Sequence, residues 1–319
     1  MQIGVNNSNI KPEDTIDLFD EQLEEWQLFS NNYDEYNDAP CERILCGNVF
    51  WEIDKILLNY RKKSITADLK TIEEGKRACF LCPASRPAEQ RWLEWRDYEI
   101  LVNPYPVSPI HFTVACRMHV PQELGDRIMD MSKLTDLVEE SCVFYNGAKC
   151  GASAPDHMHF QIVDEFHARN FMISLEYFHK GPRIGESRIY MPHRNMSPFG
   201  YYLMDIRSEK DILPMYRTII GSLNPDDGAS EPMMNVLAFK AGDSTRIAVI
   251  PRKKHRPSFY GAGTGQMLVS PASVEMMGTF ITSREEDFER LNENVILRIY
   301  NEVGYSHEEF QVFINRLQS

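Results

Sequence analysis

The chain has 319 residues, of which 43% are hydrophobic and 25% charged, which excludes a disordered or fibrous protein. At roughly 150 residues per domain, this length predicts two domains or one large composite unit. With 34 basic and 47 acidic residues the formal net charge is −13, and such an acidic surface disfavours nucleic acid as a partner.

The sequence predicts a cytoplasmic protein without membrane contact. No apolar run approaches the roughly 20 residues that cross a bilayer, and residues 1–15 lack a basic stretch followed by an apolar one. The seven cysteines are an odd number in a long chain, which argues against a secreted disulfide framework. Thiol or metal chemistry remains open.

The N-terminal quarter is predicted to be helical. Apolar residues recur at alternating three- and four-residue steps within Glu13–Tyr33, which indicates an amphipathic helix. We expect a second helix at Val49–Arg61, followed by a polar linker at Lys62–Arg77. Residues 1–75 therefore form a predicted helical extension.

The rest of the chain alternates between strand and helix patterns. Short β-type runs at Tyr98–Val102, Phe112–Cys116 and His157–Val163 are bounded by Pro, Gly and Asn. A long amphipathic helix is expected near Pro121–Tyr145. Further along we expect strands at Ile189–Met191, Tyr201–Ile206, Asn235–Phe239, Ile247–Pro251 and Glu275–Thr282, and helices near Glu209–Leu223, Glu285–Val303 and His307–Leu317.

This order predicts an α+β fold around a mixed or antiparallel sheet. Residues 76–180 and 181–319 show a similar order of elements, which fits two duplicated halves.

The segment Phe144–Val163, FYNGAKCGASAPDHMHFQIV, carries the most informative motif. On an extended strand, alternate side chains share a face, so His157, His159 and Gln161 line one surface. A polar strand face with two solvated imidazoles is the competing interpretation.

Such a face suits phosphoryl chemistry. A neutral imidazole is a nucleophile towards phosphorus when its second nitrogen is held by an acceptor, and His159 is the candidate. Gln161 can donate to a phosphoryl oxygen but cannot transfer a proton, so this face favours group transfer over hydrolysis.

The preceding loop offers phosphate contacts. Gly147, Gly151 and Ser153 can present backbone amides and a hydroxyl to phosphate oxygens, and Lys149 adds charge. Glycine-containing loops before strands are also common without any ligand.

The pair Cys79 and Cys82 forms a Cys-x-x-Cys motif. Two thiolates at this spacing can hold one Zn²⁺, but a closed site needs two further ligands. His119 and His157 are the best-placed candidates. A redox-active pair and two buried structural cysteines are the alternatives, although the surroundings of a thioredoxin are absent.

Three further features are weaker. The basic run 252–256 can face a polyphosphate, although a solvated turn is favoured. Asn103 can bond a sugar or base, or simply begin a turn before Pro104. His111 can face the pocket or pack within a strand pair, and packing is slightly favoured.

These segments resemble the galactose-1-phosphate uridylyltransferase-like branch of the histidine-triad superfamily, which includes dinucleoside polyphosphate phosphorylases and GDP-L-galactose phosphorylases. The resemblance is carried by residues 101–124 and 144–163, and more loosely by 235–255 and 269–291. It implies a structural zinc on Cys79, Cys82, His119 and His157. It also implies His159 as the nucleophile, Gln161 as the phosphate contact and Ser153 as the loop serine.

Three departures from that pattern matter. Asp156 is an apparent extra residue relative to the uridylyltransferases, and Met158 stands where they have proline, which weighs against uridylyl specificity. The C-terminal half has no His-x-His, so their second metal site does not transfer. Residues 1–75 match no pattern that we can assign.

The expected activity is that of a nucleotidyltransferase or phosphorylase. A nucleoside monophosphate would pass from a nucleoside diphosphate sugar or a dinucleoside polyphosphate through nucleotidyl-His159 to phosphate or a sugar phosphate. Gly151, Ser153, Lys149 and Asn103 are the expected substrate contacts, and a homodimer is an allowed assembly. The alternatives are a nucleotide hydrolase of the same superfamily and a nucleotide-binding protein without catalysis.

Overall fold

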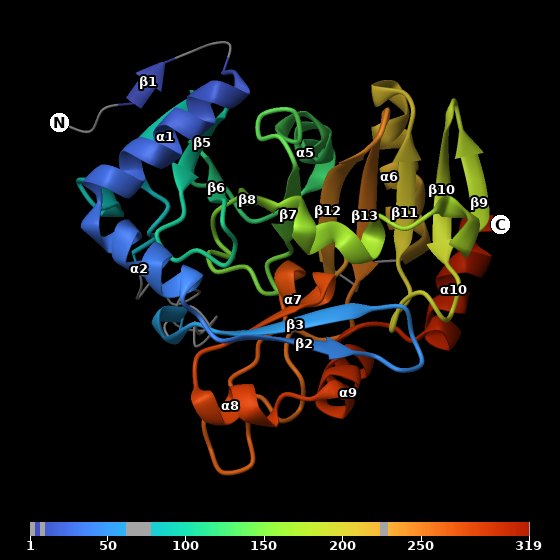
Figure 1. Ribbon diagram of the computed structural model, residues 1–319. Coiled ribbons are helices and arrows are strands. Elements are labelled where there is room, and N and C mark those ends of the chain that lie inside the picture. The colour runs from blue at the N-terminus through green and yellow to red at the C-terminus, as the bar shows by residue number, and fades with distance from the viewer. Residues whose placement is uncertain (1–3, 7–9, 62–77, 224–228, 319) are drawn as a thin grey trace.

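The computed structural model describes residues 4–6, 10–61, 78–223 and 229–318, which form an α+β fold (Figure 1). An eleven-stranded sheet, antiparallel except for its β1–β4 edge, lies beside a three-stranded one. The predicted fold class is thereby confirmed, whereas the duplication of two halves stays a prediction.

The large sheet has the spatial order β1 Gly4–Asn6, β4 Trp92–Trp95, β5 Tyr98–Val102, β6 His111–Cys116, β8 His159–Asp164, β7 Ser141–Asn146, β12 Met234–Ala241, β13 Ser244–Pro251, β11 Tyr202–Ile206, β10 Ser187–Pro192 and β9 Phe178–Ile184. The small sheet has the order β14 Thr279–Thr282, β3 Glu52–Leu57 and β2 Cys41–Leu45. The described α-helices are α1 Pro12–Glu25, α2 Gln27–Asn37, α5 Ile128–Leu134, α6 Ile212–Leu223, α7 Ser273–Met277, α8 Glu285–Arg290, α9 Glu293–Val303 and α10 His307–Gln318. Short 3-10 turns lie at Asn59–Arg61, Pro83–Ser85, Gly125–Arg127, Glu165–Phe171, Leu175–Tyr177 and Glu209–Asp211.

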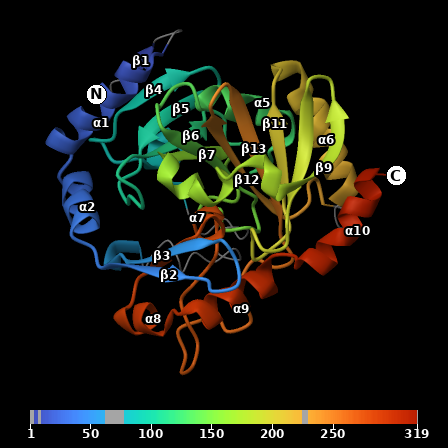
Figure 2. The ribbon, with the colours of Figure 1, turned by 45° about the vertical axis from the view of Figure 1, so that its right-hand side comes forward.

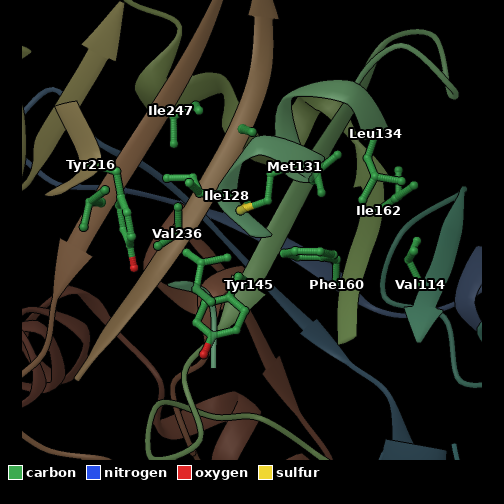
Figure 3. Packing of buried hydrophobic residues seen from close by; sticks show 14 of the residues in the cluster. Val114, Ile128, Met131, Leu134, Tyr145, Phe160, Ile162, Tyr216, Val236 and Ile247 are labelled. Atoms are coloured by element: carbon green, nitrogen blue, oxygen red, sulfur yellow. The ribbon is translucent and has the colours of Figure 1, made fainter. Parts of the chain in front are cut away.

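One face of the large sheet is covered by α1, α5, α6 and α10. Alternation along each strand sends residues such as Val143, Phe160 and Val236 to this face, where they meet Met131 of α5 and Tyr216 of α6 (Figure 3). The apolar side chains interdigitate there into one continuous buried core. Such burial removes apolar surface from water, which is the main favourable term in folding.

The opposite face of the sheet carries α7, and the small sheet lies beyond it (Figures 1 and 2). Phe144 and Leu237 of the large sheet share a second core with Met277 of α7 and Ile53 of β3. His159 and Gln161 project to this face, because they alternate with the buried Phe160. The candidate site therefore lies beside the second core.

Five sequence predictions of local structure differ from the structure. Two expected helices are each divided in two, Glu13–Tyr33 into α1 and α2 and Glu285–Val303 into α8 and α9. Residues 49–61 form β3 and a 3-10 turn instead of a helix. The helix expected over 121–145 is confined to α5, and strand β7 follows it. The strand expected over 275–282 is divided into α7 and β14 at Gly278, whose φ of +111° suits glycine.

Helices α1 and α2 lie within the predicted helical extension, whose boundary at residue 75 stays a prediction. Residues 54–57 of β3 pair in parallel with 279–282 of β14, so segments from the N-terminal and C-terminal parts of the chain share one sheet. The predicted linker 62–77 lies outside the described residues. Within the described part, no helix is long and apolar enough to cross a membrane.

Candidate active site

His159 opens strand β8 and is 2% exposed. Its Nδ1 lies 2.8 Å from the main-chain carbonyl of His157, which can only accept, so Nδ1 carries the proton and Nε2 carries the lone pair. None of the described residues bonds to Nε2, since the hydrogen bonds of His159 are made by its main chain and by Nδ1. Burial lowers the pKa of His159 to about 4, so the ring is neutral at pH 7.

Gln161 lies two residues further along the same face and is bonded to His111 of β6. His111 Nε2 lies 2.7 Å from Gln161 Oε1, and the amide N–H of Val107 donates to His111 Nδ1 over 3.3 Å. Since Nδ1 accepts, Nε2 is the donor, and burial lowers the pKa of His111 to about 3 so that the ring stays neutral. Gln161 therefore keeps its NH₂ group for a ligand.

Cys79, Cys82, His119 and His157 come together as one cluster. Their ligand atoms all lie within 4.8 Å of one another, and the Sγ–Nδ1 distances include 3.3 Å for Cys79–His157 and 3.2 Å for Cys82–His119. Tetrahedral zinc with bonds of about 2.3 Å to sulfur and about 2.0 Å to nitrogen separates such atoms by about 3.5 Å. The cluster thus fits a metal ion, and its donor set is one that zinc prefers.

The surroundings of the cluster also fit a metal site. His157 Nε2 bonds the carbonyl of Cys116 over 2.7 Å, which leaves Nδ1 for a cation, and Asp156 lies 3.5 Å from His119 Nε2. Ligating histidines commonly have such partners, which fix the tautomer. His157 precedes strand β8 and thereby links the cluster directly to His159.

Arg86 attaches the Cys-x-x-Cys turn to the sheet. Its Nε donates to the carbonyl of Leu81 over 2.8 Å, and its Nη2 lies 2.6 Å from the carboxylate of Glu99 in β5. Both side chains are buried. Because a buried charge is tolerated only when it is paired, this ion pair holds the turn in one position.

The loop before β8 approaches α7 closely. Gly151 has φ +93°, and a Cβ built there would lie 2.4 Å from Cβ of Ala272. Only glycine combines this backbone conformation with this approach. Ser153 follows it and borders both cavities described next.

Two adjoining cavities lie on this face. The inner cavity, about 90 Å³, is bordered by Gln161, Gly151 and His255 together with Arg61 and Arg256. The outer cavity, about 360 Å³, is mainly apolar. Its apolar border consists of Leu28, Tyr60, Phe80, Leu81, Pro87, Leu101, Pro104 and Tyr105.

Arg61, Asn103 and Ser153 border both cavities, so one elongated ligand can occupy the two together. Asn103 Nδ2 donates to Thr113 Oγ1 over 3.1 Å, which fixes its side chain at the boundary. The apolar outer cavity beside the polar inner cavity suits a nucleoside attached to phosphates.

Lys149 is not brought to these cavities. Its side chain is exposed and borders a separate cavity of about 530 Å³ with Gln122 and Glu231. The predicted substrate contacts Gly151, Ser153 and Asn103 therefore cluster with Gln161, and Lys149 lies apart from them.

The basic run 252–256 is divided by the fold. Arg252 is buried and donates to Asn235 Oδ1 over 2.5 Å and to main-chain carbonyls, and Lys253 pairs with Glu309. His255 and Arg256 alone border the inner cavity. Burial lowers the pKa of His255 to about 4, so at pH 7 it offers a neutral ring.

Sequence reasoning missed Arg61 and Gln122 and favoured packing for His111. The Arg61 side chain reaches the inner cavity from the far end of the 3-10 turn after β3, where a helix had been expected. The spacing of His111 and Gln161 in the chain, 50 residues, carries no signal of their bond.

Comparisons with known proteins give two family matches and a set of similar structures. A domain of unknown function (DUF4922) matches residues 18–164, and a model described as GDPGP1-like, C-terminal domain, matches residues 231–317. The first match includes the cluster, His159 and Gln161. No curated protein matches the chain.

Crystal structures of yeast Ap4A phosphorylase Apa2 share the fold. The structure in complex with AMP is 14% identical over 94% of this chain and 98% of that chain, with a TM-score of 0.60. The complex with Ap4A is 14% identical over 88% and 96%, with a TM-score of 0.56, and a third structure is 13% identical over 88% and 94%, with a TM-score of 0.55. At this identity the likeness establishes the architecture.

Proposed function

We propose that this protein is a nucleotide phosphorylase or nucleotidyltransferase that works through a covalent nucleotidyl-histidine on His159. The observation that supports this proposal most strongly is the hydrogen bonding of the His159 ring. Its Nδ1–H donates to a main-chain carbonyl, which leaves Nε2 as the nucleophilic nitrogen. The architecture shared with yeast Ap4A phosphorylase Apa2 and the GDPGP1-like match support this class of reaction.

The substrate is a dinucleoside polyphosphate or a nucleoside diphosphate sugar. We place its base in the outer cavity, against the rings of Phe80 and Tyr105, and its phosphates in the inner one, near Arg61 and Arg256. Aromatic faces bind bases of any kind, so this placement leaves the choice of base to polar groups at the border.

The reaction proceeds in two displacements. His159 Nε2 attacks the α-phosphorus, the N–P bond forms, and the bond from that phosphorus to the bridging oxygen breaks, so that a nucleoside polyphosphate or a sugar phosphate leaves with that oxygen. An oxygen of inorganic phosphate or a sugar phosphate then attacks the same phosphorus and breaks the N–P bond, which restores the lone pair on Nε2. The NH₂ of Gln161 and the backbone amides near Ser153 stabilise the negative charge on the phosphoryl oxygens.

Zinc bound to Cys79, Cys82, His119 and His157 would be structural. All four positions of a tetrahedral site are then taken by protein atoms, so the ion cross-links the turn at 79–82 to the start of β8. His157 would hold the carbonyl that orients His159.

The test is capture of the intermediate. The protein is mixed with Ap4A or GDP-sugar labelled with ³²P at the α-phosphorus and quenched in base, where phosphoramidates survive. We expect label on His159, lost in His159→Ala, and its release as a nucleoside diphosphate on addition of phosphate. Release of the label as nucleoside monophosphate, at the same rate with and without added phosphate, would instead identify a hydrolase. Tight binding without label would identify a nucleotide-binding protein.

A further inference from the structure

Gln122 lies where the sheet lacks a pair of main-chain bonds. Strands β7 and β8 are paired up to Phe144 and Gln161. In the same register, the next pair to exchange main-chain hydrogen bonds would be Asn146 and His159. The ladder ends before that point. Met158, just before β8, and residues 160 and 162 of β8 bond to β6, as in the 2.8 Å bond from Cys116 N–H to Met158 O, so the main chain of His159 faces β7.

The carboxamide of Gln122 fills this gap. Its Oε1 accepts from the N–H of His159 over 2.8 Å, and its Nε2 donates to the carbonyls of His159, over 3.1 Å, and Asn146, over 2.9 Å. Gln122 is 1% exposed. One side chain thus bonds both main-chain groups of the nucleophilic residue and also bridges to the neighbouring strand.

Gln122 is itself held from the other side. Its main-chain carbonyl accepts from the hydroxyl of Tyr145 over 3.0 Å, and Tyr145 also contacts the carboxyl of Glu231. Glu231 in turn accepts from the N–H of Leu124 over 2.9 Å. The Gln122 amide therefore has little freedom to move away from His159.

We propose that Gln122 is a positioning residue for the nucleophile, an inference that rests on the proposed function of His159. The ring of His159 is bonded to the carbonyl just before its own strand, so any shift of the main chain at 157–159 moves Nε2 relative to the phosphorus. Misplacement of a reacting atom by about 1 Å can cost about 100-fold in rate. Only a carboxamide supplies the acceptor and the two donors that this gap uses.

The test compares Gln122→Leu with the matched control Gln22→Leu. Gln22 on α1 is equally buried and also bonds two main-chain groups, since it accepts from Arg91 N–H over 2.9 Å and donates to the carbonyl of Glu89 over 3.0 Å. Its contacts lie at the β4 edge of the sheet, away from β8. Both variants lose buried hydrogen bonds of the same kind, and only one of them loses bonds to His159.

Two readouts separate positioning from general destabilisation. The first is the rate of ³²P labelling of His159 at saturating substrate, together with AMP affinity. We expect Gln122→Leu to lower the rate at least tenfold while the affinity changes less than about twofold, and Gln22→Leu to change neither. The second is the tautomer of His159 in ¹⁵N-histidine spectra, assigned with His159→Ala among the 9 histidines.

The spectra do not depend on any nucleotide, so they test Gln122 even if the wild-type protein forms no label. A protonated Nδ1 in the wild type and in Gln22→Leu, with mixed tautomers in Gln122→Leu, supports the inference. Wild-type tautomer and labelling rate retained in a folded Gln122→Leu protein overturn it. If the leucine variant does not fold, Gln122→Glu takes its place, because it keeps the volume and the acceptor but loses the donors. Its labelling rate and His159 tautomer are then interpreted in the same way.

Discussion

At the scale of single residues, His159, His111 and Gln161 are neutral polar groups whose hydrogen-bond roles are assigned by their neighbours. His111 shows this clearly, because the N–H of Val107 occupies its Nδ1 and leaves Nε2–H for Gln161. The Gln161 amide is thereby oriented with its donors towards the inner cavity. Groups arranged in advance stabilise developing charge without reorganisation cost.

Replacing His111 should therefore weaken catalysis through Gln161. We expect His111→Phe to lower the single-turnover rate about tenfold or more with little change in nucleotide affinity, because the Gln161 amide can then rotate. His167→Phe is the control, since His167 is also buried and bonds Thr279 Oγ1 over 3.0 Å, away from both cavities. Equal rate losses in the two variants would contradict this role.

The residue-level predictions from the sequence depended on local spacing. The alternation in His157–Gln161 placed His159 and Gln161 on one face, and the structure has them there. Gln122 was missed, and packing was favoured for His111, because their partners lie 37 and 50 residues away in the chain and only the strand register brings them near. The roles of all these residues stay predictions until they are tested.

At the scale of elements, the turn at 79–85 joins the cluster of Cys79, Cys82, His119 and His157 to the sheet. We expect purified protein to contain about one zinc per chain by elemental mass spectrometry. Cys82→Ser should lower both the zinc content and the melting temperature, because a site with three ligands holds the metal less tightly. Cys41→Ser, at an exposed thiol outside the cluster, should change neither. Full zinc content in Cys82→Ser would contradict the assignment of this ligand.

Arg86 offers a second test of the same element. Arg86→Met leaves the Glu99 carboxylate buried without its partner, and breaking such a pair costs about 3–5 kcal/mol of unfolding free energy. Urea denaturation should show this as a lower midpoint, partly restored in the double variant Arg86→Met, Glu99→Gln. Lys11→Met, which breaks an exposed pair with Glu13, should leave the midpoint unchanged.

Element predictions succeeded where one periodicity extended over the whole element. The strand at Tyr98–Val102 was predicted with the bounds that it has, α6 lies within its expected helix, and α10 extends one residue beyond its own. Residues 49–61 were predicted wrongly because β3 is buried at four consecutive positions, 53–56, and its sequence lacks the apolar–polar alternation that marks a strand with one exposed face.

At the scale of the whole molecule, stability should depend on pH through Glu231. Burial raises the pKa of this carboxyl to about 7, so between its ordinary value of 4.5 and 7 the folded protein holds a proton that the unfolded chain has lost. Stability therefore falls as pH rises through this window, by at most about 1.4 kcal/mol per pH unit. Glu231→Gln should reduce that slope in urea titrations between pH 4.5 and 7.5. An unchanged slope would show that Glu231 is ionised in the folded protein.

The division at residue 180 that the sequence predicted can be tested with fragments. The sheet runs without a break across it, since β7 pairs with β12 through five residue pairs, and β3 pairs with β14. We expect fragments 1–180 and 181–319 to be unfolded or insoluble alone and to assemble when expressed together. A fragment with a cooperative thermal transition of its own would support separate domains.

The pairing of β3 with β14 also constrains how the chain is made. A ribosome adds about 5–20 residues per second, so residues 52–57 emerge roughly ten to fifty seconds before their partner strand exists. During that interval one edge of β3 lacks its partner strand while the rest of the protein is still being made. Chaperones that shield such segments co-translationally should therefore raise the yield, and slow translation of the final 45 codons should lower it.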